Sequence, residues 1–351
     1  MIKNKSLTRR ITAIALVVLF ALPAFAQQNL TQPRASQRAS VSQRVGLTDI
    51  TIKYHRPGVK DRVIWGELVP YDQVWRAGAN ENTTINFSTE VSIQGNVIPA
   101  GTYGLHMIPT DSDWTIILSK DYEAWGSFFY IEENDQLRFK TTPKSAGFEE
   151  WLSYSFSDVS PNSTVVSLRW AKLEVPFTID VDVNKIVAAN MKKELTNLAG
   201  FGWQGWNQIA TYYYTNDMDM DEALTLVDRS IQINGNVTNS FTKSIILESM
   251  GDTEAASKLK EEGFQNATEA NINTLGYQYL FAGKIDKAMQ VFKKNVELFP
   301  DSWNVYDSLG ECYAAAGNEG EAHKYYSIAL QKAPDNQKQR ITGVLNNLQG
   351  S

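Results

Sequence analysis

Apolar and polar residues alternate along the first half of the chain. Between Val45 and Val183 apolar side chains recur at every second position, as in Ile50-Thr51-Ile52-Lys53-Tyr54. Turn-forming sequences such as Arg56-Pro57-Gly58 separate these runs. Period two predicts strands with one buried face, and the lack of intervening helical patterns predicts antiparallel pairing. We therefore predict an all-β domain over residues 44–183, an antiparallel β-sandwich of jelly-roll type with about eight or nine strands.

Beyond this domain the pattern changes to a helical period and repeats itself. Residues of the same kind recur at an offset of 34 positions in two copies: Leu275, Gly276, Tyr279, Ala288, Phe292 and Pro300, then Leu309, Gly310, Tyr313, Ala322, Tyr326 and Pro334. This period and its Leu-Gly-x-x-Tyr, Ala-x-x-x-aromatic and Pro pattern resemble the tetratricopeptide repeat, a pair of packed helices. The resemblance implies small residues where helices cross, aromatic residues in the gaps and a proline after each second helix.

Weaker copies precede these two units. Residues around Ile209-Ala210 and Leu247 fit earlier units in part. Because such a stack needs three or more units to hold together, we predict four helix pairs in an all-α solenoid over residues 203–351. We expect Arg340–Leu348 to form a capping helix and residues 184–202 to form a linker helix.

The N-terminus has the pattern of a secretory signal peptide over residues 1–26. Four lysines and arginines precede the uncharged run Ile11–Leu22, and Ala24-Phe25-Ala26 forms a small-x-small cleavage site. Because this run is short for a bilayer core of about 30 Å, a retained membrane anchor is the weaker alternative. We predict an exported protein, periplasmic or secreted, without stable membrane insertion once the signal is removed. Residues 27–43, rich in Gln, Ser and Arg, are predicted to be a flexible leader.

Composition excludes several classes of protein. Among the 351 residues, 43% are hydrophobic and 21% charged, close to globular averages, which excludes a disordered chain or a multi-span membrane protein. Removing residues 1–26 with their four positive charges lowers the formal net charge from −6 to −10, so we predict no nucleic-acid partner. The single cysteine, Cys312, excludes an internal disulfide framework. We expect it to be buried, the alternative being an intermolecular bond.

One part of the strand-rich half resembles a known family. The resemblance rests on the segments Thr51–Arg62, Val74–Glu81 and Pro99–Tyr103, of which Val-Trp-Arg-Ala-Gly-Ala-Asn-Glu is the most specific. These segments resemble the exported bacterial family called domain of unknown function 2911, which is common in Bacteroidetes. The resemblance covers about residues 35–182, and it implies no established activity.

A cluster of polar residues in this motif is the candidate site. Arg76, Asn80 and Glu81 lie within six residues, beside Trp75 and close to the polar end of the strand that carries Arg56. Arginine, asparagine and glutamate together offer donors, acceptors and a general base. They predict either a small polar pocket for a ligand or carbohydrate, with hydrolysis as one use, or a polar network in which Arg76 and Glu81 pin the sandwich.

Metal and cofactor chemistry has weaker support. His55, His106 and His323 share no metal-ligand spacing, and no phosphate-binding loop or nucleophile motif is present in the sequence. We therefore predict no metal and no cofactor. The leading hypothesis is a non-enzymatic binding or scaffold protein whose repeats hold a protein or peptide partner. The first helices of the repeats offer polar positions for that contact, such as Gln278, Asn304 and Asp307.

Overall fold

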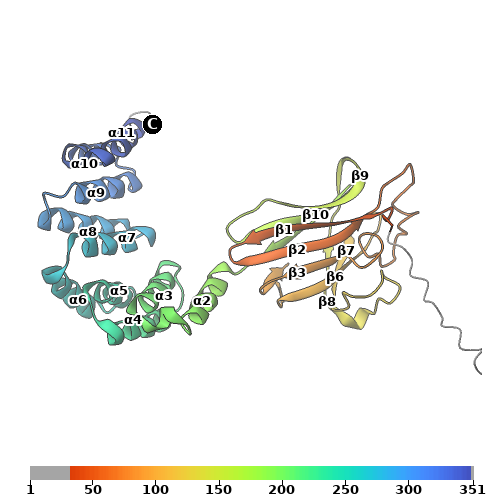
Figure 1. Ribbon diagram of the computed structural model, residues 1–351, viewed down its shortest axis with the longest axis horizontal. Coiled ribbons are helices and arrows are strands. Elements are labelled where there is room, and N and C mark those ends of the chain that lie inside the picture. Colours follow the sequence, from red (N-terminus) through yellow and green to blue (C-terminus); the bar gives the residue numbers. More distant parts are fainter. Residues whose placement is uncertain (1–31, 349–351) are drawn as a thin grey trace, which may run out of the picture.

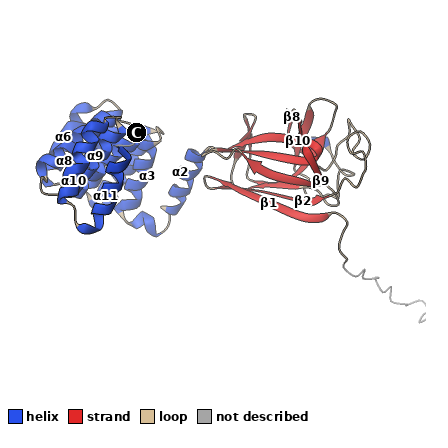
Figure 2. Ribbon diagram, turned by 90° about the horizontal axis from the view of Figure 1, so that it is seen from above, coloured by secondary structure: helices blue, strands red, loops and turns tan. Residues whose placement is uncertain are grey.

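The computed structural model describes residues 32–348. A β-sandwich is followed by a curved stack of helices, and the helix α2 (Val183–Glu194) joins the two parts (Figures 1 and 2). The predicted fold class, an antiparallel sandwich followed by a helical solenoid, is confirmed. The change from period two to a helical period at Val183 in the sequence is where strands give way to helices.

The sandwich consists of two antiparallel sheets. A six-stranded sheet has the order β1-β2-β3-β6-β7-β8, and a four-stranded sheet has the order β5-β4-β10-β9. The described residues thus form ten strands rather than eight or nine. Their bounds are β1 (Gln37–Val45), β2 (Thr48–Arg56), β3 (Thr84–Phe87), β4 (Val91–Ile93), β5 (Asn96–Ile98), β6 (Gly101–Ile108), β7 (Trp114–Ser119), β8 (Asp135–Thr141), β9 (Lys144–Ser157) and β10 (Ser163–Asp180).

One strand that the sequence did not predict is β1, which corrects the predicted leader. It pairs with β2 along its whole length, from Gln37 opposite Arg56 to Val45 opposite Thr48. The prediction of a flexible leader is therefore wrong for residues 37–43, while residues 27–31 lie outside the described chain. The low apolar content of this segment suggested a flexible chain, but an edge strand needs few apolar residues. Its backbone pairs with a neighbour on one side, and its outer face is exposed to solvent.

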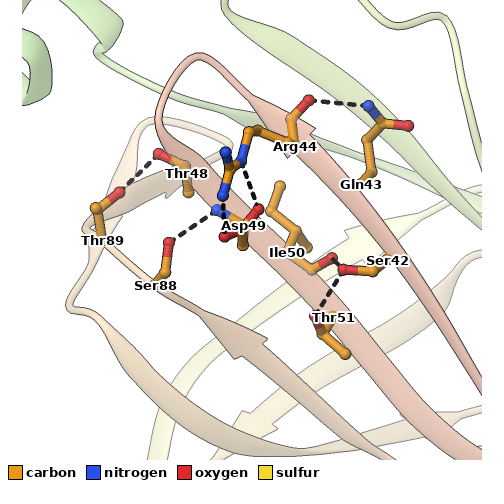
Figure 3. A network of polar contacts seen from close by, with 9 residues as sticks. All are labelled: Ser42, Gln43, Arg44, Thr48, Asp49, Ile50, Thr51, Ser88 and Thr89. Atoms are coloured by element: carbon orange, nitrogen blue, oxygen red, sulfur yellow. Dashed lines mark hydrogen bonds and ion pairs between the residues drawn. The ribbon is translucent and has the colours of Figure 1, made fainter.

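Polar side chains hold the hairpin of β1 and β2 at the end near the helices (Figure 3). The Arg44 guanidinium donates to both carboxylate oxygens of Asp49, at 2.8 and 2.7 Å. The hydroxyls of Thr48 and Thr89 lie 2.7 Å apart and tie the turn to the loop after β3. Directional polar bonds, which hydrophobic periodicity does not report, thus contribute to the position of β1.

The core of the sandwich lies between the two sheets and is rich in tryptophan. Trp114 and Trp170 are almost fully buried. Trp65 packs edge-on against both, with ring centroids 4.7 and 5.7 Å away, and Trp75 stacks on Trp170 at 6.0 Å. Large rings that meet in edge-to-face and stacked geometry contribute much of the packing energy of a domain of this size.

The helical part contains four antiparallel helix pairs and a final helix. The pairs are α3 (Trp203–Thr215) with α4 (Met220–Asn234), α5 (Val237–Ser249) with α6 (Thr253–Asn266), α7 (Glu269–Phe281) with α8 (Ile285–Leu298), and α9 (Trp303–Ala315) with α10 (Glu319–Lys332), and α11 (Asp335–Leu348) packs against α10. The first helices of successive pairs contact one another along the inner side of the curve (Figure 1). The stretch predicted as a linker helix is α2 followed by the short helix η2 (Leu198–Phe201).

The residues that recur after 34 positions lie between the packed helices or just after them, as the repeat pattern implied. Leu275, Tyr279, Ala288 and Phe292 are almost fully buried. Their counterparts Leu309, Ala322 and Tyr326 are buried as well, while Tyr313 is half-buried and stacks on Tyr325 at 5.3 Å; Pro300 and Pro334 follow the ends of α8 and α10. Gly276 and Gly310 are the close crossing points: a Cβ on Gly276 would overlap the Phe292 ring, and one on Gly310 would lie 3.1 Å from the Tyr326 ring. Cys312 is also buried, as expected.

The polar residues expected to face a partner are instead packed between repeats. Gln278 and Asp307 are buried, which shows that the expectation of exposed contacts was wrong for them. The amide of Gln278 donates to Thr242 Oγ1 at 3.1 Å, and Asp307 accepts from Arg340 at 2.8 Å. Neighbouring first helices lie so close that polar side chains between them bond to each other rather than to solvent.

The glycines of the stack predict a graded mutational series. Gly276→Ala is expected to lower the free energy of unfolding by about 1–3 kcal/mol, because its methyl group would overlap Phe292. Gly310→Ala should cost less, because Tyr326 needs to move only slightly. Gly343→Ala in α11 meets open space and should stabilise by up to about 1 kcal/mol. Thermal unfolding followed by circular dichroism at the helical band checks this order; equal effects at the three sites would contradict it.

Candidate functional site

The segment Val74–Glu81, the most specific part of the sequence motif, forms a tight turn at the end of the sandwich. Trp75 exchanges two backbone hydrogen bonds with Met107, both 2.8 Å. Ala77 has a left-handed backbone (φ 50°) and is fully buried. Its carbonyl accepts hydrogen bonds from Tyr154 Oη at 2.9 Å and Thr83 Oγ1 at 3.1 Å. The turn therefore bonds to both sheets.

Asn80 and Glu81 hold the chain that leads into β1. The Asn80 side chain donates to the Ser36 carbonyl at 3.1 Å. The Glu81 carboxylate accepts two bonds from Arg34 Nη1, at 2.6 and 2.7 Å, and lies 3.4 Å from His55 Nε2. The hydrogen bond from Arg34 holds the pKa of Glu81 below its ordinary value. These two residues place a segment that is distant in the sequence.

Arg76 and Glu81 do not pair, so the pinning ion pair considered from the sequence is absent. The Arg76 guanidinium packs against Gly126, where a Cβ would lie within van der Waals overlap of Nη1. Its Nε is buried and has no hydrogen-bond partner within the described part of the chain. Burial lowers the pKa of Arg76 from its ordinary value. Arg76 thus lies under the loop 120–131 rather than beside Glu81.

Arg56 and Trp75 have structural contacts. Arg56 Nε donates to the Leu152 carbonyl at 2.8 Å and so bonds to β9, beside a cavity of about 320 Å³ that Gln37 and Trp151 also line. Trp75 Nε1 donates to the Gly78 carbonyl at 3.2 Å, and its ring packs in the tryptophan core. The structure therefore does not bring the five predicted site residues together around one cavity.

A larger cavity lies on the outer face of the six-stranded sheet, and we call it the outer-face pocket. Its volume is about 530 Å³, and it is lined by Arg34, Arg38, Lys53, Tyr54, His55, Glu81, Asn82, Thr84, Tyr122, Glu123 and Ala124. Of the predicted site residues, Glu81 is the one that lines it.

Strand register explains the floor of the outer-face pocket. Arg38 lies opposite His55, Lys53 opposite Thr84, and Thr84 opposite Gly104. Because Ile52 and Tyr54 point into the core, the intervening residues Lys53 and His55 point outward. At Gly104 the loop that follows β7 approaches the sheet closely: a Cβ there would lie 3.0 Å from the Asp121 carbonyl oxygen.

The loop 120–131 covers this floor. The Asn82 amide donates to the Asp121 carbonyl at 3.1 Å, and His106 Nδ1 lies 3.0 Å from Ser127 Oγ. His106 and Ile117 occupy outward positions of their strands but are 1% and 0% exposed. The loop therefore turns part of an exposed sheet face into a walled cavity.

The outer-face pocket has an excess of positive charge. It contains three cationic side chains and the two carboxylates Glu81 and Glu123, of which Glu81 is bonded to Arg34. Among the described residues Arg38 and Lys53 have no ion-pair partner. The pKa of His55 is lowered, first by burial and further by the neighbouring arginines, while Glu81 acts in the opposite direction. At neutral pH the His55 imidazole is therefore uncharged.

A second cavity lies on the inner side of the helical stack, and we call it the inner-face pocket. Its volume is about 510 Å³, and its lining comes mainly from α2 and α3 with Phe281 of α7. Val187, Met191 and Leu195 supply apolar walls. The Phe281 side chain is 73% exposed, although it stacks on Tyr277 at 5.6 Å. Sequence periodicity did not identify this cavity, because it forms between helices from different repeats.

Within residues 32–348 no group of three or more His, Cys, Asp or Glu side chains could hold a metal ion. Over the same residues no helix is both long and apolar enough to cross a bilayer.

The fold defines a two-part protein, a β-sandwich of two antiparallel sheets followed by tetratricopeptide-like helix pairs. Residues 36–179 match the family model described as "Protein of unknown function (DUF2911)", which confirms the resemblance seen in the sequence. The match covers the sandwich and excludes the helical repeats. No curated protein matches the chain significantly.

Several solved structures align with part of this chain. MamA is 18% identical and aligns over 45% of this chain and 92% of its own, with a TM-score of 0.26. PcrH from Pseudomonas aeruginosa is 13% identical over 32% of this chain and 91% of its own, with a TM-score of 0.25. YrrB, described as a tetratricopeptide protein with an unusual peptide-binding site, is 16% identical over 44% of this chain and 80% of its own, with a TM-score of 0.25.

Burial of His106 predicts a specific pH dependence of stability. Burial lowers the pKa of His106 to about 4 in the folded protein, whereas the unfolded chain takes up the proton near pH 6.5. As pH falls from 6.5 to 4 the unfolded state therefore binds more protons and stability is lost, by about 3 kcal/mol in total. His106→Asn should lack this loss, as measured by urea unfolding at pH 7.0 and 4.5. His323→Asn in α10 is the control and should keep it; an unchanged pH dependence in His106→Asn would contradict the prediction.

Proposed function

We propose that this protein is a non-enzymatic binding or scaffold protein that uses its helical repeats to hold a peptide segment of a partner protein. The observation that supports the proposal is the inner-face pocket. It combines the apolar residues of α2 with the exposed ring of Phe281 on the curved inner side of the stack. An apolar cavity on a concave helical surface suits a large apolar side chain of a bound peptide.

The polar surroundings of this pocket suit a peptide backbone. Gln208, Thr211 and Thr215 line it from α3 alongside the Tyr212 ring. Amide and hydroxyl groups next to an apolar anchor site satisfy the hydrogen-bonding groups of a peptide while its side chain is buried. The inner-face pocket thus offers both parts of a peptide-binding site.

We also propose that the protein acts outside the cytoplasm, in the periplasm or as a secreted protein. The proposal rests on the signal-peptide pattern of residues 1–26, which lie outside the described chain. The net charge of −10 that follows cleavage agrees with partners other than nucleic acids and anionic membranes.

Selection of peptides from a random displayed library on the protein without residues 1–26 tests the role of the repeats. Enriched peptides should share a large apolar residue. Phe281→Ala should weaken an enriched peptide at least about tenfold in isothermal calorimetry, because an exposed aromatic anchor is a typical binding hot spot.

Phe128→Ala is the matched control for this experiment. Phe128 is 80% exposed but lies in the loop of the sandwich, so its loss should leave peptide affinity unchanged. A library that yields no reproducible binder, or peptides that bind Phe281→Ala as tightly as the unchanged protein, would rule against the inner-face pocket as the site.

A further inference from the structure

We propose that the outer-face pocket of the sandwich binds an acidic sugar, a ligand that carries both a carboxylate and several hydroxyl groups. The site is independent of the helical repeats and of the peptide-binding role proposed for them. It rests on three features of the outer-face pocket: its unpaired cations, its buried unpartnered polar atoms and its aromatic wall.

The cations identify the charge of the ligand. Arg38 and Lys53 lie on neighbouring strands and line the same cavity, and neither has an acidic partner among the described residues. Arg34 is already bonded to Glu81 and is therefore less available. A carboxylate placed between Arg38 and Lys53 would be held by charge-assisted hydrogen bonds.

The buried polar atoms identify the rest of the ligand. Asn82 is 7% exposed; its Nδ2 donates to the Asp121 carbonyl, while its Oδ1 has no hydrogen-bond partner among residues 32–348. His55 is 9% exposed; its Nε2 faces Glu81, whereas no described residue bonds to its Nδ1. A buried acceptor without a partner destabilises the protein unless something donates to it. Hydroxyl groups of a ligand supply such donors.

The size and walls of the outer-face pocket agree with a sugar. A cavity of about 530 Å³ lies within the range that holds small organic ligands. Tyr122, a residue that is 39% exposed, also lines it, and its ring offers an apolar surface against which the C–H face of a sugar ring can pack. Thr84 contributes a hydroxyl group to the floor.

Calorimetric titration of the protein without residues 1–26 tests the proposal, with D-glucuronate and D-galacturonate as probes. At least one of the two should bind at millimolar concentrations, and D-glucose should bind at least about tenfold more weakly because it lacks the carboxylate. Acetate should also bind at least about tenfold more weakly, because it cannot reach Asn82 and His55. Glucose 6-phosphate separates the two anion types: equal or tighter binding than the uronates would overturn the assignment to a carboxylate.

Substitutions at exposed positions keep the test clear of unfolding. Arg38→Gln and Lys53→Gln should each weaken uronate binding by about tenfold, since each removes one charge-assisted bond. Lys140→Gln on β8 is the matched control, an exposed strand lysine outside the pocket, and should change nothing. Failure of both uronates to bind, or binding that Arg38→Gln and Lys53→Gln leave intact, would overturn the proposal. Neither result bears on the inner-face pocket, because these substitutions leave Phe281 untouched.

Discussion

The carbonyl group of Ala77 is the point on which this end of the sandwich depends. It accepts hydrogen bonds from Tyr154 of the four-stranded sheet and from Thr83, which leads into β3 of the other sheet. Next to it, a Cβ on Gly78 would lie 2.5 Å from Thr83 Oγ1, so the close approach requires glycine. A buried carbonyl that accepts two hydrogen bonds has a fixed orientation, and it therefore fixes the direction in which the rest of the turn leaves the core.

The outer-face pocket follows from this fixed turn. Once Ala77 is held, Asn80 and Glu81 point toward the segment before β1 and bind Ser36 and Arg34. That attachment places β1 against β2 and so brings Arg38 opposite His55. The motif residues therefore act mainly by positioning other side chains. The pocket residues without an ion-pair partner among the described residues, Arg38 and Lys53, come from the neighbouring strands β1 and β2.

The sequence predicted the regular elements well, because burial has a period that can be read along the chain. Ile50, Ile52 and Tyr54 alternate and are buried, and the residues that recur after 34 positions pack the helix pairs. The candidate site was harder to predict. The backbone is left-handed at Ala77 (φ 50°) and Asn80 (φ 59°), which turns the neighbouring side chains in different directions. Arg76 and Glu81 are therefore close in sequence, but their side chains have different partners in the structure. Lys53 and His55 could be recognised as outward positions of β2, but nothing local in the sequence indicates that the loop 120–131 folds over them.

The helix α2 links the sandwich to the inner-face pocket of the helical stack. Its first turn packs against the sandwich: Val183 and Ile186 contact that core, and Lys185 forms an ion pair with Glu90 at 2.8 Å. Its second half belongs to the helical stack, where Met191 and Leu195 pack against the other core and line the inner-face pocket. A peptide bound there would contact the same rigid helix that is anchored to the sandwich. Because α2 is one continuous helix of twelve residues, its contacts with the sandwich and with the helical stack lie within a few turns of each other, and a peptide in the inner-face pocket would be held close to the sandwich.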